Sequence, residues 1–587
     1  MKALQACRPL ADAALRAPTR RMGLAALALL AALACATSGP VRAEPRTVCT
    51  ITVNSPDEKE AMRRHLPSGQ YRFVELVERG RPDWLQSACE RKVQCDVLVV
   101  SGHFNGHDFF SDKLTAQEYL PVAEMERVSC SNACPNLFSH LKEVYLFGCT
   151  SLSPELSYNR GAEIERRLVR AGQSRGEAQR VARMLSDRYE ESNRDFMRRV
   201  FRNVPAIYGF SNVAPLGPTS GYLLDRYFQG GAGNMFTGRP NPRLLATFSA
   251  HNMAMASGLT ESDPHTPYRA EACEFVDDRL TAVQKLRFIH TILDRDAPEA
   301  RMFLERIEGF LATLTPADRE DPQFVAARGE IAGDAEARAR YLDYARGVDP
   351  AGVRARMLTV AHSIGWLDDE AYHDEQIRLA ADLMSGPPMS TADLDVLCTQ
   401  NANGELDARI ASLTPSRFTG DRIDRAAALA CLGSAPDRSR MLDALASADE
   451  TDQRMAEVYF RHRPITDDAE LREVASAIAG MSGAPDAQAQ ALDTLSRMRI
   501  ADAAVLNELM RLFEVAPSLK VQRAIAGIMI RADYTKIATP QTASMLRERR
   551  IRSRDGEDVI DILIRRVQAS ASLAPPRLDA TSAETNG

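Results

Sequence analysis

Two short apolar runs, each ending at a glycine and a reactive side chain, constrain the fold of this chain most strongly. The first run, Val97–Ser101, is followed by a glycine and His103, and the second, Val144–Phe147, is followed by a glycine and Cys149. Continuous apolar runs of this length are typical of buried parallel strands. Because reactive groups gather at the carboxyl ends of strands in an open α/β sheet, the sequence predicts an imidazole and a thiol at one sheet edge.

The segments around these two runs alternate between strand and helix patterns. Strands are predicted at Thr47–Asn54 and Tyr71–Val77, with a helix at Ser55–Leu66 between them. A mostly helical stretch, 162–200, then leads into a further strand at Val204–Ser211. This alternation predicts an α/β fold with a parallel sheet and helices on both of its faces.

The order of the two motifs resembles that of the caspase-like cysteine peptidases of clan CD, which include caspases, metacaspases, legumains, gingipains and separases. In that group one core strand ends in His-Gly and the next ends in the nucleophilic Cys. Ser101–His103 and Phe147–Cys149 correspond to these motifs, and the small hydroxyl residues within Gly148–Ser151 are similar to the separase branch. The resemblance covers Val48–Phe228 and implies a caspase-like parallel-sheet sandwich.

The resemblance implies peptide-bond hydrolysis by a dyad of Cys149 as nucleophile and His103 as general base and acid. It also implies oxyanion donors from the backbone N–H of Cys149 and from the loop after the histidine. The family has a glycine directly after the histidine, whereas this chain has Phe104 there and its next glycine is Gly106. This departure leaves an alternative open, in which a catalytically inactive caspase-like fold serves as a binding scaffold.

Candidate substrate-binding residues follow from the same resemblance. The specificity pocket of the family is lined partly by the strand after the cysteine strand, which points here to Tyr208, Ser211 and Asn212. Glu155, just after the Cys149 loop, would favour a basic substrate side chain. The expected substrate is therefore a protein or peptide, and no cofactor is expected.

A rival interpretation of the same segment is a zinc site. His103 and His107 are four residues apart, as are Cys130 and Cys134, and together they would supply a Cys2His2 ligand set. In an exported protein, disulfide formation competes for these cysteines. A zinc site would remove His103 from catalysis.

The N-terminus has the pattern of an export signal. Two arginines precede the short apolar run 22–34, and Val41–Ala43 supplies small residues for cleavage. We therefore expect a signal peptide at 1–43 and a periplasmic or secreted protein, with a lipoprotein attached through Cys35 as the alternative. No later segment is apolar enough to predict a transmembrane span.

Export makes the cysteine count informative. Of 11 cysteines, Cys7 and Cys35 fall in the leader, so an odd number remains, and Cys149 is the natural unpaired one. Cys130 and Cys134 stand as a local pair in the loop between the two strands. The remaining cysteines, whose connectivity stays open, are Cys49, Cys89, Cys95, Cys273, Cys398 and Cys431.

From about residue 273 the strand patterns give way to helical periodicity. Four segments resemble one another at intervals of roughly 30–35 residues, the range of helical-pair repeats. Such repeats resemble HEAT repeats and predict an α-solenoid, which typically offers an extended surface to a protein partner. The four segments begin at Asp424, Gln453, Gln488 and Gln522.

The length of 587 residues requires more than one hydrophobic core. An apolar content of 45% and a charged content of 26% are ordinary for soluble proteins, and a net charge of −6 gives no reason to expect a nucleic-acid partner. After the signal peptide we expect a caspase-like domain at 44–256, a linker at 257–272, a HEAT-like helical domain at 273–568 and a disordered tail at 569–587.

Overall fold

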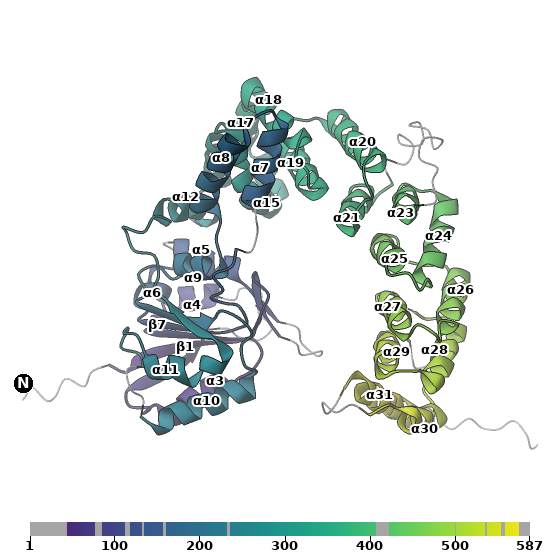
Figure 1. The fold of residues 1–587 in the computed structure, drawn as a ribbon. Helices are drawn as coiled ribbons and strands as arrows, with labels where there is room; N and C mark the ends of the chain where they lie inside the picture. Colours follow the sequence, from purple (N-terminus) through teal and green to yellow (C-terminus); the bar gives the residue numbers. More distant parts are fainter. Residues whose placement is uncertain are drawn as a thin grey trace, which may run out of the picture. The chain divides into compact units, whose positions relative to one another are not determined.

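A computed structural model of the chain describes two compact units (Figure 1). The α/β unit comprises Met1–Tyr158 and Glu190–Arg279, and the helical unit comprises Asn159–Tyr189 and Leu280–Gly587. The expected signal peptide, with Cys7 and Cys35, and the last part of the expected tail lie outside the described residues. The described residues are 44–76, 85–111, 118–131, 134–156, 160–231, 235–404, 406, 422–498, 500–533, 537–552 and 558–573.

A six-stranded sheet forms the centre of the α/β unit, with the strand order β2-β1-β3-β7-β8-β9. Its first five strands run parallel, and only the edge strand β9 is antiparallel. The mostly parallel sheet predicted from the sequence is therefore confirmed. The strands are β1 (Arg46–Thr52), β2 (Tyr71–Glu75), β3 (Val97–Ser101), β7 (Glu143–Phe147), β8 (Ala206–Phe210) and β9 (Met253–Ala256).

Helices cover both faces of this sheet because alternate residues of each strand point to opposite sides. In β3, Val97 and Val99 belong to one buried apolar cluster, and Leu98 and Val100 belong to the other. The first cluster includes residues of α3 (Asp57–His65), α10 (Gly217–Gln229) and α11 (Pro242–Thr247). The second includes residues of α4 (Gln86–Glu90), α5 (Val122–Cys130), α6 (Pro135–Ser139) and α9 (Asn193–Val200).

A second, three-stranded antiparallel sheet follows β3 directly. It consists of β4 (His103–Phe104), β5 (Asp108–Phe110) and β6 (Tyr119–Pro121). Only Gly102 separates β3 from β4, so His103 is the first residue of this smaller sheet.

The expected linker at 257–272 differs from the structure. Helix α12 (Thr266–Val276) begins inside it and belongs to the α/β unit, to which the Cys130–Cys273 disulfide ties it. The Ser-, Pro- and Thr-rich composition of this segment reflects the turns that precede α12, because these residues favour turns as well as linkers. The short helix η1 (Ser249–His251) lies between α11 and β9. A helical hairpin inserted between β7 and β8 is a second departure from the expected boundaries.

This inserted hairpin consists of α7 (Arg160–Arg170) and α8 (Arg175–Tyr189), and it belongs to the helical unit. The guanidinium of Arg301 forms a bidentate ion pair with Glu163 of α7, and the two side chains are only 4% and 7% exposed. Arg167 also donates to the carbonyl of Tyr344 at 3.0 Å. The chain thus leaves the α/β unit after the Cys149 loop and returns to it before α9.

The rest of the helical unit consists of successive helices, as predicted for the region after residue 273. The last of them continues to Leu573, beyond the expected start of the tail at 569. Among the described helices, none is long and apolar enough to cross a membrane. The helices are α13 (Ala282–Leu293), α14 (Ala297–Met302), α15 (Leu304–Thr313), α16 (Pro316–Glu320), α17 (Pro322–Gly333), α18 (Ala335–Arg346), α19 (Ala351–Ser363), α20 (Asp369–Ser385), α21 (Thr391–Gln400), α23 (Ile423–Cys431), α24 (Ala435–Leu445), α25 (Glu450–His462), α26 (Asp468–Ala479), α27 (Pro485–Leu495), α28 (Ala503–Val515), α29 (Leu519–Arg531), α30 (Pro540–Arg549) and α31 (Val559–Leu573).

The four similar segments each place a buried polar side chain near the start of a helix: Asp424 in α23, Gln453 in α25, Gln488 in α27 and Gln522 in α29. The last carbonyl groups of a helix have no hydrogen-bond donor within that helix. Each of the three glutamines supplies such a donor to the helix that precedes its own. Their Nε2 groups donate to carbonyls near the ends of α24, α26 and α28, namely Leu445, Ile478 and Phe513. The repeat seen in the sequence is thus a recurring helix-to-helix contact.

Candidate active site at the carboxyl edge of the sheet

The pairing of β3 with β7 brings His103 and Cys149 to the same edge of the sheet. Ser101 is opposite Phe147 in the parallel register, and the N–H of Gly102 donates to the carbonyl of Phe147 at 3.2 Å. His103 and Cys149 each follow two residues after this last pair. Since neighbouring strands lie about 4.8 Å apart, the backbones of His103 and Cys149 start from neighbouring positions at this edge of the sheet.

Gly148 allows the two motifs to approach closely. A Cβ atom at this position would lie 2.8 Å from the Cβ of Phe104 and 3.2 Å from the carbonyl oxygen of Gly102. These two residues flank His103 on either side, and Gly148 immediately precedes Cys149. Any larger residue would therefore push the thiol loop away from the histidine strand.

Cys149 is the one described cysteine outside a disulfide, and it is half-buried. The backbone N–H of Ala214 donates to its Sγ at 3.4 Å. A donor aimed at the sulfur suits a thiolate, which is the nucleophilic form of cysteine. The prediction that Cys149 is the odd cysteine is confirmed for the described part of the chain.

The pairing of the other cysteines corrects the expected local pair. Cys130 bonds to Cys273 and Cys134 bonds to Cys89, so the two do not pair with each other. Because both are in disulfides, the alternative zinc site has lost two of its four ligands, leaving His103 and His107. Among the described residues, no group of three or more His, Cys, Asp or Glu side chains is arranged to hold a metal ion. The remaining disulfides are Cys49–Cys95 and Cys398–Cys431.

The backbone turns sharply directly after Cys149. Thr150 has a φ of +54°, a left-handed conformation that is unfavourable for a β-branched residue. Its N–H donates to the carbonyl of Asn212 at 2.8 Å, and its carbonyl accepts from Nδ2 of Asn193 at 3.0 Å. Hydrogen bonds on both sides hold this turn, which carries the thiol out of the strand.

The loop after Thr150 is fastened to β8. The hydroxyl of Ser151 accepts from the N–H of Phe210, and the N–H of Leu152 donates to the Phe210 carbonyl at 2.9 Å. Ser151 is fully buried. The thiol therefore sits on a loop that is anchored to the sheet.

His103 is half-buried, and its ring lies against that of Phe110, with centroids 5.4 Å apart. The next residue, Phe104, is buried against Phe109. Because side chains alternate along a strand, His103 points away from this buried contact.

The two predicted oxyanion positions after the histidine have different surroundings. Phe104 lies within β4, whereas Gly106 lies at the tip of the hairpin between β4 and β5 with a φ of +99°. The side chain of Asn105 shapes this tip by accepting the N–H groups of His107 and Asp108. The loop thus differs from a plain His-Gly turn, as the substitution at Phe104 suggests.

Tyr208 does not belong with the predicted substrate contacts. It is fully buried, its hydroxyl donates to the carbonyl of Arg239 at 3.2 Å, and its ring stacks on Tyr145. It is therefore a core residue. The alternation of side chains along the strand could not identify Tyr208 as a core residue, because β8 is buried on both faces.

The other predicted substrate contacts lie on the loops that follow β7 and β8. Asn212 is exposed and accepts a hydrogen bond from the residue after Cys149, while Glu155 is exposed on the loop that follows it. Ser211 is half-buried and bonds to the carbonyl of Asn252 through both its N–H and its hydroxyl. Asn212 and Glu155 are thus the better placed of these candidates.

Sequence patterns did not single out Asn193 or Glu58, which also lie near this edge. Glu58, in the first turn of α3, is buried and hydrogen-bonds to Ser101 and Ser220. Burial raises the pKa of its carboxyl group to about 7. In the sequence it is one of several acids at a helix start, and only the packing of α3 against β3 and α10 distinguishes it.

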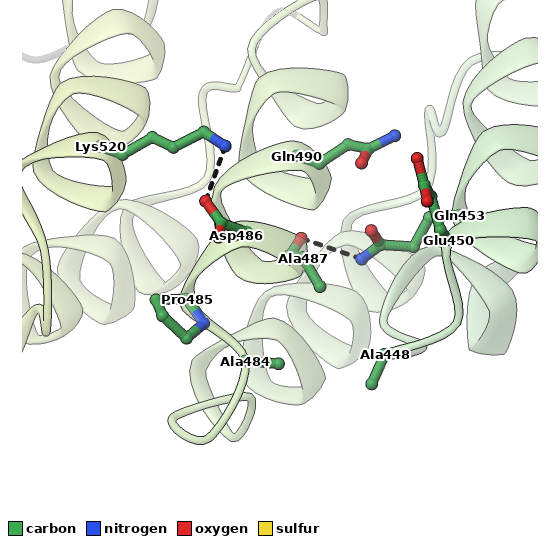
Figure 2. Close-up of a pocket in the computed structure, with 9 residues that line it drawn as sticks. All are labelled: Ala448, Glu450, Gln453, Ala484, Pro485, Asp486, Ala487, Gln490 and Lys520. Carbon is green, nitrogen blue, oxygen red and sulfur yellow. Dashed lines mark hydrogen bonds and ion pairs between the residues drawn. The ribbon is translucent and has the colours of Figure 1, made fainter.

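The helical unit contains a polar pocket of about 500 Å³ at the starts of α25, α27 and α29 (Figure 2). Nζ of Lys520 pairs with Asp486 at 2.8 Å, and Nε2 of Gln453 donates to the carbonyl of Ala487 at 2.9 Å. Glu450 and Gln490 complete its polar lining.

Comparison of the chain with protein-family models, with curated proteins and with solved structures finds no match. The functional inference therefore depends on the geometry of the molecule. A thiol and an imidazole at adjacent strand ends, on loops fixed by backbone hydrogen bonds, are suited to nucleophilic attack with proton transfer.

Proposed function

We propose that this chain is a caspase-like cysteine peptidase in which Cys149 and His103 form the catalytic dyad. The observation that carries the proposal is the position of both residues just beyond paired ends of the adjacent parallel strands β3 and β7. The mostly parallel sheet with helices on both faces agrees with the fold that the motif resemblance implies. That Cys149 stands outside the four disulfides supports a reactive rather than a cross-linking role.

In this mechanism the thiolate of Cys149 attacks the carbonyl carbon of a peptide bond and forms a C–S bond. The imidazolium of His103 gives its proton to the departing amine nitrogen as the C–N bond breaks, which leaves a thioester. A water molecule then attacks the thioester while His103 accepts its proton, and the acid product and the thiolate separate. Backbone N–H groups of Cys149 and of the Phe104–Gly106 segment would stabilise the oxyanion.

The helical unit would serve as a HEAT-like solenoid that recruits a protein substrate or partner. Its recurring glutamine contacts support a repeat architecture, which typically presents an extended binding surface. The pocket lined by Gln490 and Lys520 is a polar recess on that unit. Four disulfides agree with export to the periplasm or outside the cell, either as a secreted protein or as a lipoprotein through Cys35.

One observation favours the alternative of an inactive scaffold. Phe104 replaces the glycine after the histidine, and its side chain is buried in the β4–β5 hairpin against Phe109. A scaffold of this kind would retain the fold and the solenoid but would bind peptides without cleaving them.

Incubation of the mature protein with a proteome-derived peptide library, followed by mass spectrometry of new termini, tests the proposal. We expect cleavage by the wild type and none by Cys149→Ala or His103→Ala. Cleavage that persists in both variants, or a wild type that cleaves no peptide, would contradict the peptidase assignment.

A further inference from the structure

We infer that Asn193 is a positioning residue that holds the Cys149 loop in register with the His103 hairpin, an inference that rests on the proposed function. The side-chain amide of Asn193 lies between the two segments. Its Nδ2 donates to the Thr150 carbonyl at 3.0 Å, one residue beyond the thiol. Its Oδ1 faces the hairpin tip, where a Cβ added at Gly106 would lie 3.8 Å away.

The bond to Thr150 has a particular consequence because Thr150 is in the left-handed conformation. Such a conformation is unfavourable for a residue with a Cβ atom and persists only where its surroundings hold it. Here the hydrogen bonds to Asn212 and Asn193 hold the residue from its N–H and its carbonyl. Without the Asn193 donor, Thr150 is free to relax toward negative φ, which changes the direction in which Cys149 leaves β7.

Asn193 is not needed to start its own helix. The N-cap of α9 is Ser192, whose hydroxyl accepts the N–H of Asp195. Asn193 occupies the first helical position, where its backbone N–H has no partner within the helix. Its side chain is not the N-cap of α9, and its Nδ2 bonds to the Thr150 carbonyl of the neighbouring loop.

Two further backbone contacts tie this segment to the Cys149 loop. The N–H of Arg194 donates to the carbonyl of Ser153 at 3.1 Å, and Leu156 and Ser192 form an antiparallel bridge. Both contacts are made by the main chain and survive a side-chain substitution at position 193. A change there consequently removes the amide bridge while leaving the attachment of α9 to the loop.

The test measures the alkylation rate of Cys149 by iodoacetamide between pH 5 and pH 9, in the mature full-length protein, with mass spectrometry to assign the modified residue. The variants are Asn193→Asp, Asn193→Ala and His103→Ala. Asn193→Asp is the most discriminating variant, because the carboxylate keeps the size of the amide but lacks its N–H donor. An acid also suits the first turn of a helix, so the variant should not destabilise α9. Arg194→Ala is the matched control, since the Arg194 side chain is 45% exposed and forms an ion pair with Asp195, while its backbone N–H is kept.

We expect Asn193→Asp and Asn193→Ala to lower the alkylation rate at pH 6 by about 10- to 100-fold, as a misplaced reactive group does. We also expect them to shift the pH profile toward that of His103→Ala, with the thermal unfolding midpoint close to that of the wild type. Arg194→Ala should stay within about twofold.

The outcomes distinguish a failure of the positioning role of Asn193 from a failure of the Cys149–His103 dyad. If His103→Ala lowers the rate but both Asn193 variants keep the wild-type rate and pH profile, the positioning role of Asn193 is overturned while the dyad stands. If His103→Ala also reacts as the wild type does, the proposed dyad fails, and the role assigned to Asn193 fails with it. A loss in Asn193→Asp that is matched by Arg194→Ala would mean a general disturbance of α9 and would likewise overturn the inference.

Discussion

The α/β unit and the helical unit both use polar side chains to join neighbouring elements, but they do so in different ways. In the helical unit Gln453, Gln488 and Gln522 recur at the same place in alternate helices, and each bonds to the end of the helix before its own. In the α/β unit the amide of Asn193 bonds to the left-handed Thr150 on the loop that carries the thiol.

This difference distinguishes polar side chains that stabilise the fold from those expected at a functional site. A buried contact that is repeated along a solenoid contributes a nearest-neighbour interface to stability wherever it occurs. A strained residue beside a reactive side chain, held by hydrogen bonds from several elements, is the pattern expected of a functional site. We therefore expect substitutions in the two units to affect different observables.

The largest expected effect is on the stability of the helical unit, from Arg301→Met. The substitution leaves the Glu163 carboxylate buried without its partner, and breaking a buried ion pair in this way costs about 3–5 kcal/mol. Urea unfolding followed by circular dichroism measures the loss. The matched control is Arg340→Met, whose acidic partners Glu336 and Asp294 are 87% and 69% exposed, so that the expected loss stays below about 1 kcal/mol. Equal losses in the two variants would contradict the account.

The next effect concerns the α/β unit and depends on pH. The pKa of Glu58 is raised from 4.5 to about 7, so the folded protein keeps a proton that the unfolded chain releases. Stability therefore falls as the pH rises from about 4.5 to 7, by about 3 kcal/mol in total. Glu58→Gln stays neutral, and we expect it to be more stable than the wild type at pH 8 and similar to it at pH 4. Urea unfolding at both values measures this.

Glu60→Gln is the control for this pH dependence, because Glu60 is on the same helix and its side chain is 43% exposed. It should keep the wild-type fall in stability between pH 4 and pH 8. A wild type whose stability does not change across this range, or a Glu58→Gln variant that shows the same fall, would refute the assignment.

Gly148→Ala tests the close approach of the two motifs. The added Cβ would meet Phe104 at 2.8 Å, and such overpacking costs about 1–3 kcal/mol. We also expect slower alkylation of Cys149, because the thiol loop must move. The control Gly176→Ala lies in helix α8 with no atom within 4 Å of the added group, so it should be neutral or slightly stabilising. An unchanged alkylation rate of Cys149 in Gly148→Ala would contradict the close approach of the Cys149 loop to the His103 segment.

The smallest expected effect comes from a single repeat contact. Gln488→Ala removes the donor to the Ile478 carbonyl, a loss of about 1 kcal/mol in the helical unit, with the alkylation rate of Cys149 unchanged. Thermal unfolding of this variant is compared with that of Gln490→Ala, a half-buried residue of the same helix whose change should stay within about 0.5 kcal/mol. A slower alkylation of Cys149 in Gln488→Ala would break the distinction between the two units.

The sequence predicted those features that depend on local pattern. The apolar run at Val97–Ser101 gives β3 with the same bounds, because a strand buried on both faces needs a continuous apolar stretch. The odd number of cysteines predicted that Cys149 is unpaired. The similar segments contain the buried glutamines of the helical unit.

Features that depend on tertiary packing were not predictable from the pattern. The partners of Cys130 and Cys134 are set by how α5, α6 and their neighbours fold together, which their spacing of four residues does not reveal. The assignment of 159–189 to the helical unit depends on contacts such as that between Glu163 and Arg301, far apart in sequence. The role inferred for Asn193 likewise exists only because α9 lies beside the Cys149 loop.

Labelling of the mature protein with a panel of thiol-reactive peptide electrophiles tests the proposed dyad most directly. Wild type, His103→Ala and Cys149→Ala are compared, and mass spectrometry locates the label. The account predicts labelling at Cys149 that depends on the peptide sequence and falls sharply when His103 is removed. Labelling of Cys149 that is equally fast in His103→Ala, or a Cys149 that no member of the panel modifies, would contradict it.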